Sequence, residues 1–218
     1  MTALVRYTAA HLMHSQRYLP PLLLYFVLMA ILTSGDSGPL IPLYAGCAAA
    51  VLAWATWFTA SVVNLEDPVS RAILVVNAGS SRKVLHAAVV VALGASVVIT
   101  AFSIGFPLVT GSHTVTATDL AIGAEGQLTC AFVGIAIGQI CSRLVIRRAG
   151  IALLAALTLV VFAIVQRWAV PVHPLLVLME GSKPTADIAL DGAGYAAIAV
   201  VLLIAATLAT HFISDRRD

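Results

Sequence analysis

The sequence predicts an all-α membrane protein with six transmembrane helices and both termini in the cytoplasm. The first reason is composition: 61% of the 218 residues are hydrophobic and 10% are charged, with a mean hydropathy of +1.01. Soluble domains carry about 25% charged residues. The second reason is a set of six apolar runs close to the roughly 20 residues that a spanning helix needs. The third is the distribution of basic residues between these runs.

The chain starts with a segment, residues 1–18, that predicts a short helix lying at the membrane interface. Arg6 and Arg17 fall at the edge of this helix, where they can reach lipid headgroups. The segment lacks the continuous apolar region of a cleavable signal peptide, so none is expected. Its apolar side is predicted to consist of Val5, Ala9, Leu12 and Met13.

Six apolar runs follow, and each is predicted to cross the bilayer. The first and fifth are short, so flanking Arg17, Tyr18 and Trp168 are expected to anchor them. The whole chain, residues 1–218, is therefore predicted to form one transmembrane domain. The runs cover residues 19–33, 41–63, 84–109, 120–142, 149–166 and 193–212.

Basic residues indicate the orientation. With the N-terminus inside, the outer segments hold Arg167 and Lys183 alone. Cytoplasmic loops carry the excess of Lys and Arg, so a multi-pass plasma-membrane protein with both ends inside is expected. A net charge of +2 without a basic tract argues against nucleic-acid binding. The ten residues on inner segments are Arg6, Arg17, Arg71, Arg82, Lys83, Arg143, Arg147, Arg148, Arg216 and Arg217.

The cytoplasmic connection between the second and third runs predicts a short capped helix within residues 66–79. Asp67-Pro68 suits the N-cap and the first helical position, and Gly79 suits a left-handed stop. Two interpretations remain open: an interfacial helix that fills a loop, or a docking helix for a cytoplasmic partner. An apolar stripe at i, i+4 and i+7 consists of Val69, Ile73 and Val76.

The long outer connection, residues 167–191, contains the apolar run Leu175–Met179, which is too short to span. It predicts an interfacial or re-entrant helix. In the fourth apolar run, Glu125 and Gln127 are polar groups whose exposure to lipid is costly. They are expected to line a substrate path or a dimer seam, or, for Glu125, to reach the headgroups. The pattern Gly134-x-x-x-Gly138 has a spacing that permits close helix packing. These glycines are likewise expected to line a substrate path or a dimer seam.

No catalytic or metal site is predicted. Ser37, in the Gly-Asp-Ser-Gly sequence at 35–38, is interpreted as part of a tight turn, because His211 lies on the other side of the membrane and a serine nucleophile needs a nearby base. Neither EGSKPT nor NAGSSRK has the spacing of a phosphate-binding loop. ATP hydrolysis is therefore not expected on this chain. The cysteines match no metal site; they are Cys47, Cys130 and Cys141.

This layout resembles the permease subunits of type-2 ATP-binding-cassette exporters along the whole chain. Those permeases have an interfacial N-terminal helix, six spans, a coupling helix after the second span and an outer re-entrant helix before the sixth. The chain departs from the family at Arg71-Ala72, where a Glu is usual, and at Asn77-Ala78, which replaces a Thr-Pro pair. The local sequence that loosely matches is Glu66-Asp67, Ile73-Leu74, Asn77-Ala78 and Ser81-Arg82.

The resemblance implies partners and a division of labour. Two permeases, as a homodimer or heterodimer, would form the path, and separate ATPase subunits would bind ATP and Mg. Alternatives are a non-transport membrane protein, such as an assembly factor or signalling anchor, and a haem-exporter-type permease, although no tryptophan-rich haem motif is seen. The expected ATPase-docking residues are Glu66, Asp67, Val69, Arg71, Ile73 and Val76.

Overall fold

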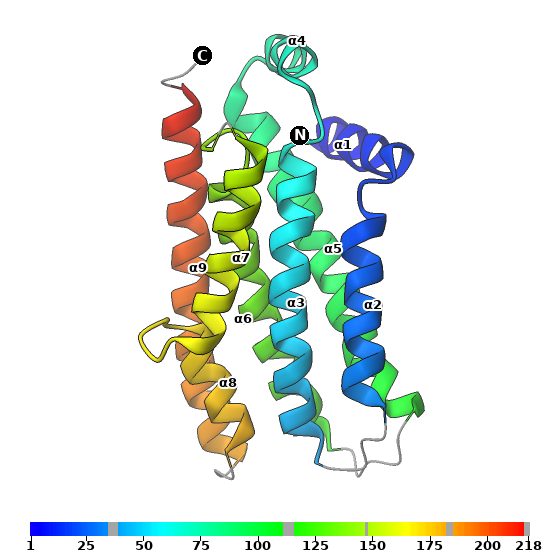
Figure 1. Cartoon of the computed structure of the whole chain (residues 1–218), viewed down its shortest axis with the longest axis vertical. Helices are drawn as coiled ribbons and strands as arrows, with labels where there is room; N and C mark the ends of the chain where they lie inside the picture. Colours follow the sequence, from blue (N-terminus) through cyan, green and yellow to red (C-terminus); the bar gives the residue numbers. More distant parts are fainter. Residues whose placement is uncertain (35–38, 111–115, 147, 182–184, 216–218) are drawn as a thin grey trace.

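The computed structural model describes residues 1–34, 39–110, 116–146, 148–181 and 185–215, and all regular structure in these ranges is helical. Figure 1 shows a bundle of roughly parallel helices with short helices at its ends. The helices are α1 (Thr2–Ser15), α2 (Leu19–Thr33), α3 (Leu40–Val63), α4 (Pro68–Ala78), α5 (Ser81–Thr110), α6 (Ala117–Ile140), α7 (Ala149–Val165), α8 (Val172–Glu180) and α9 (Thr185–Asp215).

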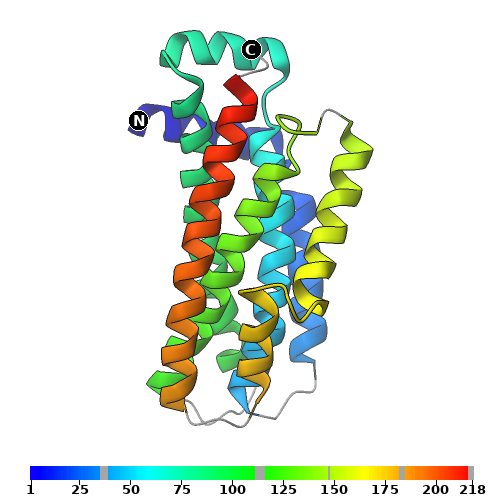
Figure 2. The ribbon, with the colours of Figure 1, turned by 90° about the vertical axis from the view of Figure 1, so that its left-hand side faces the viewer.

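The long helices run side by side, and the short ones are placed at opposite ends. In Figures 1 and 2, α4 and α1 lie across one end of the bundle, which we call the α4 end, and α8 lies towards the other. The last turns of α9 also reach the α4 end. Helix α1 and the last turns of α9 are therefore found at the same end of the molecule.

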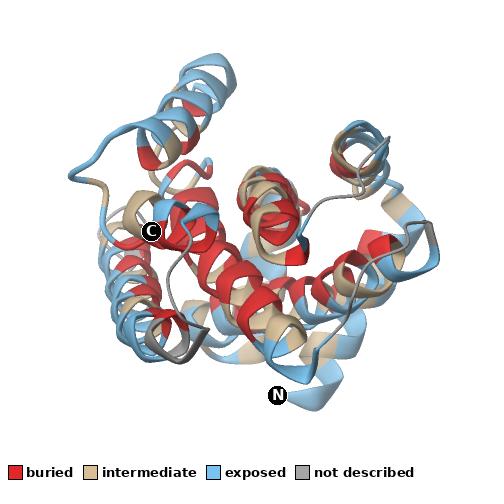
Figure 3. Cartoon of the chain, turned by 90° about the horizontal axis from the view of Figure 1, so that it is seen from below, coloured by how far each residue is buried: buried red, intermediate tan, exposed pale blue. Residues whose placement is uncertain are grey.

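The core lies along α3 and α6, which pack against each other more extensively than any other pair. Two thirds of the apolar window in each of these helices is buried, against 22% in α9. Figure 3 shows the buried residues concentrated where helices face one another, with the outer surfaces exposed. On the other side of α3, Tyr25 of α2 packs edge-on against Trp54, with ring centroids 6.4 Å apart.

Within the described residues, four helices are long and apolar enough to cross a membrane: α3, α5, α6 and α9. The pair α1 and α2, bent by 75°, makes a fifth candidate if it counts as one span. Large apolar side chains such as Val98, Leu154 and Val201 are more than half exposed on the outside of the bundle. Such a surface is suited to lipid, so the structure supports the prediction of an all-helical membrane protein.

The structure bears in different ways on three further expectations from the sequence. On the predicted apolar side of α1, Leu12 is buried against the bundle and Met13 is 61% exposed; Thr8, outside that side, is buried as well. Helix α9 begins at Thr185, so it takes up the last part of the predicted outer connection 167–191. The turn predicted at 35–38 lies outside the described residues.

Candidate functional site

The short helix α4 has the N-terminal cap that the sequence predicts. One carboxylate oxygen of Asp67, Oδ1, accepts hydrogen bonds from the backbone amides of Val69 (2.9 Å) and Ser70 (3.0 Å). The other, Oδ2, accepts from the Ser70 hydroxyl at 3.1 Å. Pro68 occupies the first helical position, where its missing N–H costs nothing. The amides of the first turn are thus satisfied by the side chain that precedes them.

The other end of α4 is closed just as specifically. Gly79 adopts a left-handed conformation with φ +72°, and its N–H donates to the Val76 carbonyl at 3.2 Å. Lys83 of α5 donates from Nζ to the Ala78 carbonyl at 3.1 Å. A positive charge at this position also interacts favourably with the negative end of the helix dipole. The predicted capped helix is confirmed, and α4 begins and ends where local chemistry dictates.

The cap makes α4 sensitive to acid. Hydrogen bonds from the Ser70 amide and hydroxyl, with that of Val69, hold the pKa of Asp67 below its ordinary value. The ionised cap therefore stabilises α4 at neutral pH, and this contribution is lost as pH falls below about 4, through the lowered pKa. We expect the amide NMR shifts of Val69 and Ser70 to titrate there. In the Asp67→Asn variant these two amide shifts should not change with pH. If they still titrate in that variant, the transition belongs to a group other than Asp67.

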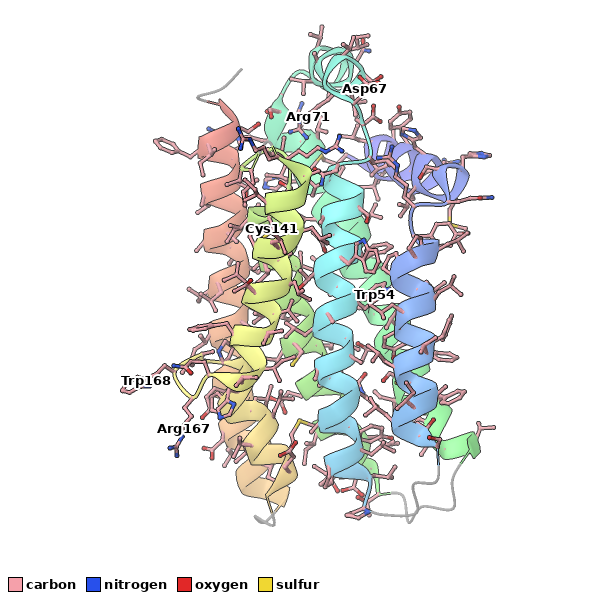
Figure 4. The ribbon with its side chains drawn as sticks, in the orientation of Figure 1. Trp54, Asp67, Arg71, Cys141, Arg167 and Trp168 are labelled. Atoms are coloured by element: carbon pink, nitrogen blue, oxygen red, sulfur yellow. The ribbon has the colours of Figure 1, made fainter. Side chains whose placement is uncertain are left out.

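The apolar stripe of α4 faces away from the rest of the chain. Val69, Ile73 and Val76 are 71%, 59% and 80% exposed. The opposite side, with Arg71 and Leu74, borders a small space that is also lined by Leu65, Val84 and Leu85. Figure 4 places Asp67 and Arg71 at the α4 end. The structure therefore uses one face of α4 for attachment and leaves the stripe uncovered by any described residue.

Glu66 belongs to the attachment of this segment and not to its exposed face. Its Oε1 accepts a hydrogen bond from the Tyr7 hydroxyl at 3.0 Å, and His11 Nδ1 lies at the same distance. The Glu66 side chain is 11% exposed. Partial burial, together with the hydrogen bond and charge of Glu66, raises the pKa of Tyr7. The carboxylate thus joins α1 to the segment that leads into α4.

A second set of hydrogen bonds centres on Asn64, at the end of α3. Arg17 donates from Nη1 to the Asn64 carbonyl at 2.8 Å, and the backbone N–H of Arg143 donates to Asn64 Oδ1 at 2.8 Å. Arg82, at the start of α5, donates from Nε to His211 Nε2 at 2.7 Å. The segments around α4 are therefore connected to the α1–α2 turn, the α6–α7 turn and α9.

The residues proposed for the fourth apolar run are not brought together into one site. Glu125 is half-buried and faces α9, where a Cβ built at Gly192 would lie 3.2 Å from its carboxyl carbon. Gln127 is fully buried, and neither of its amide atoms has a hydrogen-bond partner among the described residues. Gln127 therefore lies inside the core of one chain, and its role in a substrate path stays a prediction.

The two glycines of the Gly-x-x-x-Gly pattern contact α3 of the same chain. A Cβ at Gly134 would lie 2.7 Å from the Leu52 carbonyl oxygen, and one at Gly138 would lie 2.5 Å from that of Thr56. Both glycines are buried. A dimer seam at these positions is therefore corrected to an intramolecular one, because their surface is already covered by α3.

Sequence reasoning missed a groove between α2, α3 and α7. It has a volume of about 510 Å³, and Arg17, Asn64 and Arg143 lie at one end of it. Its apolar walls include Trp57 of α3 and Leu157 of α7. No periodic pattern could have revealed it, because its lining comes from three separate helices. The basic residues at its end are the one feature of the groove that the sequence alone could indicate.

The described residues contain no group of three His, Cys, Asp or Glu side chains that could hold a metal ion. All three cysteines are buried, as their positions in apolar runs predict, and none forms a disulfide within the described residues. Neither a family model, nor a curated protein, nor a solved structure matches this chain.

Proposed function

We propose that this chain is the transmembrane subunit of an ATP-driven exporter. It would dimerise with a second permease to form the substrate path, and it would couple to a separate ATPase subunit that binds ATP and Mg. In this proposal α2 and α7 complete a set of six spans, and both termini are cytoplasmic. The observation that carries it is α4: a helix capped at both ends whose apolar stripe is exposed at the end of the bundle.

The exposed stripe favours a docking role over a loop-filling one. Aliphatic side chains that only closed a loop would gain most by turning towards Leu65 and Val84, where Leu74 already lies. Instead Val69, Ile73 and Val76 point away from the chain. Adjacent exposed apolar residues on a rigid support are typical of a protein contact. Because α4 lies beyond the ends of α3 and α5 in Figures 1 and 2, a partner could reach it from the aqueous side.

Basic residues support placing this end in the cytoplasm. The connections at the α4 end carry most of the described Lys and Arg, whereas Arg167 lies in the connection between α7 and α8 (Figure 4). This asymmetry follows the positive-inside rule. The basic residues of the α4 end are Arg6, Arg17, Arg71, Arg82, Lys83, Arg143 and Arg148.

The attachment of α4 supports a coupling role. A force on the stripe would reach α1 through Glu66 and His11, and the α6–α7 turn through Asn64 and the Arg143 amide. It would reach α5 directly through Lys83. A helix held by a flexible loop alone would absorb such a movement. The hydrogen bonds around α4 instead give it several routes to the spanning helices.

Co-purification tests the proposal. The full chain, extracted from its native membrane in mild detergent, is expected to retain an ATPase subunit. ATP hydrolysis by the reconstituted mixture should then depend on the chain. A partner without a nucleotide-binding site would favour a signalling anchor or assembly factor. That result, or ATP hydrolysis that is the same with and without this chain, would contradict the proposal.

A further inference from the structure

The groove between α2, α3 and α7 runs along the bundle axis from the α4 end. On α3 its lining extends from Asn64 to Ala53, and on α7 from Ala149 to Val160. At 1.5 Å per residue, each stretch is about 16 Å long. This is close to half of the roughly 30 Å hydrocarbon core of a bilayer. The groove thus has the depth of one leaflet, measured from the end where the polar residues lie.

The groove is open on the outside of the bundle and its walls are apolar. Trp57 is 40% exposed, and Leu153 and Leu157 of α7 are 62% and 61% exposed. Small side chains make the space between these larger ones. They are Ala53 and Ala60 on α3, and Ala149, Ala152 and Ala156 on α7. A volume of about 510 Å³ lies within the range of pockets that hold small organic ligands.

The mouth of the groove carries two arginines, Arg17 bound to Asn64 through its side chain and Arg143 through its backbone. Arg17 Nη1 donates to the Asn64 carbonyl, and the Arg143 backbone N–H donates to Asn64 Oδ1, each at 2.8 Å. Within the described ranges, neither arginine forms an ion pair with a carboxylate. Arg17 still has donors on Nε and Nη2 that no described residue accepts, in a geometry that suits phosphate oxygens. Both side chains are exposed.

We propose that this groove binds an anionic phospholipid from the leaflet at the α4 end. The acyl chains lie along the apolar walls past Trp57, and the headgroup phosphate lies between Arg17 and Arg143. The apolar length requires a long hydrocarbon, and the two arginines select a negative headgroup. This binding site does not depend on the proposed exporter function, since an anchor protein with the same groove would bind the same lipid.

The test uses the full chain in detergent, with phosphatidylglycerol and phosphatidylcholine of identical acyl chains added in equal amounts. Native mass spectrometry then measures the ratio of the two lipids that remain bound. We expect wild-type protein to prefer phosphatidylglycerol. Arg143→Gln should lower the ratio about fivefold, since one basic residue near an anionic lipid contributes about that factor in affinity. Arg17→Lys keeps a charge and should lower it less.

Two further variants separate charge from the groove itself. Arg167→Gln removes the same charge from the connection between α7 and α8, outside the groove and away from the α4 end, and should leave the ratio unchanged. Ala156→Trp fills the apolar part and should reduce binding of both lipids. Should Ala156→Trp fail to fold, the Arg143→Gln comparison still decides, because the exposed Arg143 side chain forms no hydrogen bond or ion pair with a described residue.

Three outcomes would overturn the proposal. The ratio could be equal in wild type and Arg143→Gln, or Arg167→Gln could lower it as much as Arg143→Gln does. Alternatively, a Leu157→Cys variant could form disulfide-linked dimers in native membranes. That would show that a second copy of the chain covers the groove in place of a lipid.

Discussion

Ile73→Asp is expected to abolish association with the ATPase subunit while leaving the membrane protein folded. Ile73 is the central residue of the exposed stripe, between Val69 and Val76, and its side chain is 59% exposed. An aspartate there remains hydrated in the isolated chain. On docking it would be buried without a partner, which costs several kcal/mol. A loss of about 3 kcal/mol corresponds to more than a hundredfold in affinity.

The measurement is the yield of ATPase subunit that co-purifies with each variant at equal amounts of membrane protein. Ile73→Val is the matched control, because it keeps an apolar β-branched side chain at the same position and should retain the partner. Equal yields from Ile73→Asp and Ile73→Val would remove α4 as the docking element. If Ile73→Asp instead prevented insertion, the alternative of an interfacial helix that fills the loop would be favoured.

Gly138→Ala is expected to destabilise the bundle by about 1–3 kcal/mol, the usual cost of overpacking a tight core. The added Cβ would lie 2.5 Å from the Thr56 carbonyl oxygen and 2.8 Å from Thr59 Cβ. The first of these is backbone and cannot rotate away, so α3 and α6 must separate. Because this pair forms the core, the strain is not confined to the surface.

Gly94→Ala provides a control of opposite sign. Gly94 lies in α5, is exposed, and a Cβ there would meet nothing within 4 Å. Alanine is a better helix former than glycine by roughly 1 kcal/mol, so this variant should be neutral or more stable. Unfolding in mixed micelles, followed by circular dichroism, compares the two. A Gly138→Ala protein as stable as Gly94→Ala would disprove the close contact between α3 and α6.

Local features of the site could be predicted because neighbouring residues produce them. Asp67 starts α4 by accepting hydrogen bonds from residues two and three positions along the chain, Pro68 suits the first helical position, and Gly79 ends the helix with one left-handed conformation. The stripe of α4 could be predicted because its apolar residues recur at helical spacing, while polar residues occupy other faces of the helix. The length and position of the apolar runs likewise indicated the long helices, with boundaries that the structure moves by a few residues, except at the start of α9.

Contacts between helices could not be predicted in the same way. The long helices are apolar on every side, so no periodicity tells which face is buried and which faces lipid. Gly134 and Gly138 suited either a dimer seam or an internal contact, and the fold placed them against α3. Glu66 carries the charge expected of a docking residue, yet it is turned towards His11, 55 residues away in the chain.

The sequence by itself determined that this chain is helical, suited to a membrane and equipped with one capped, amphipathic helix. Composition and hydrogen bonds within a few residues are sufficient for each of these. The tertiary structure alone decided which face of α4 is exposed, which glycines bring α3 and α6 together, and that Arg17 and Arg143 meet at Asn64. These features depend on packing between distant segments, and in a uniformly apolar chain that packing is set by side-chain shape, which local sequence patterns do not express.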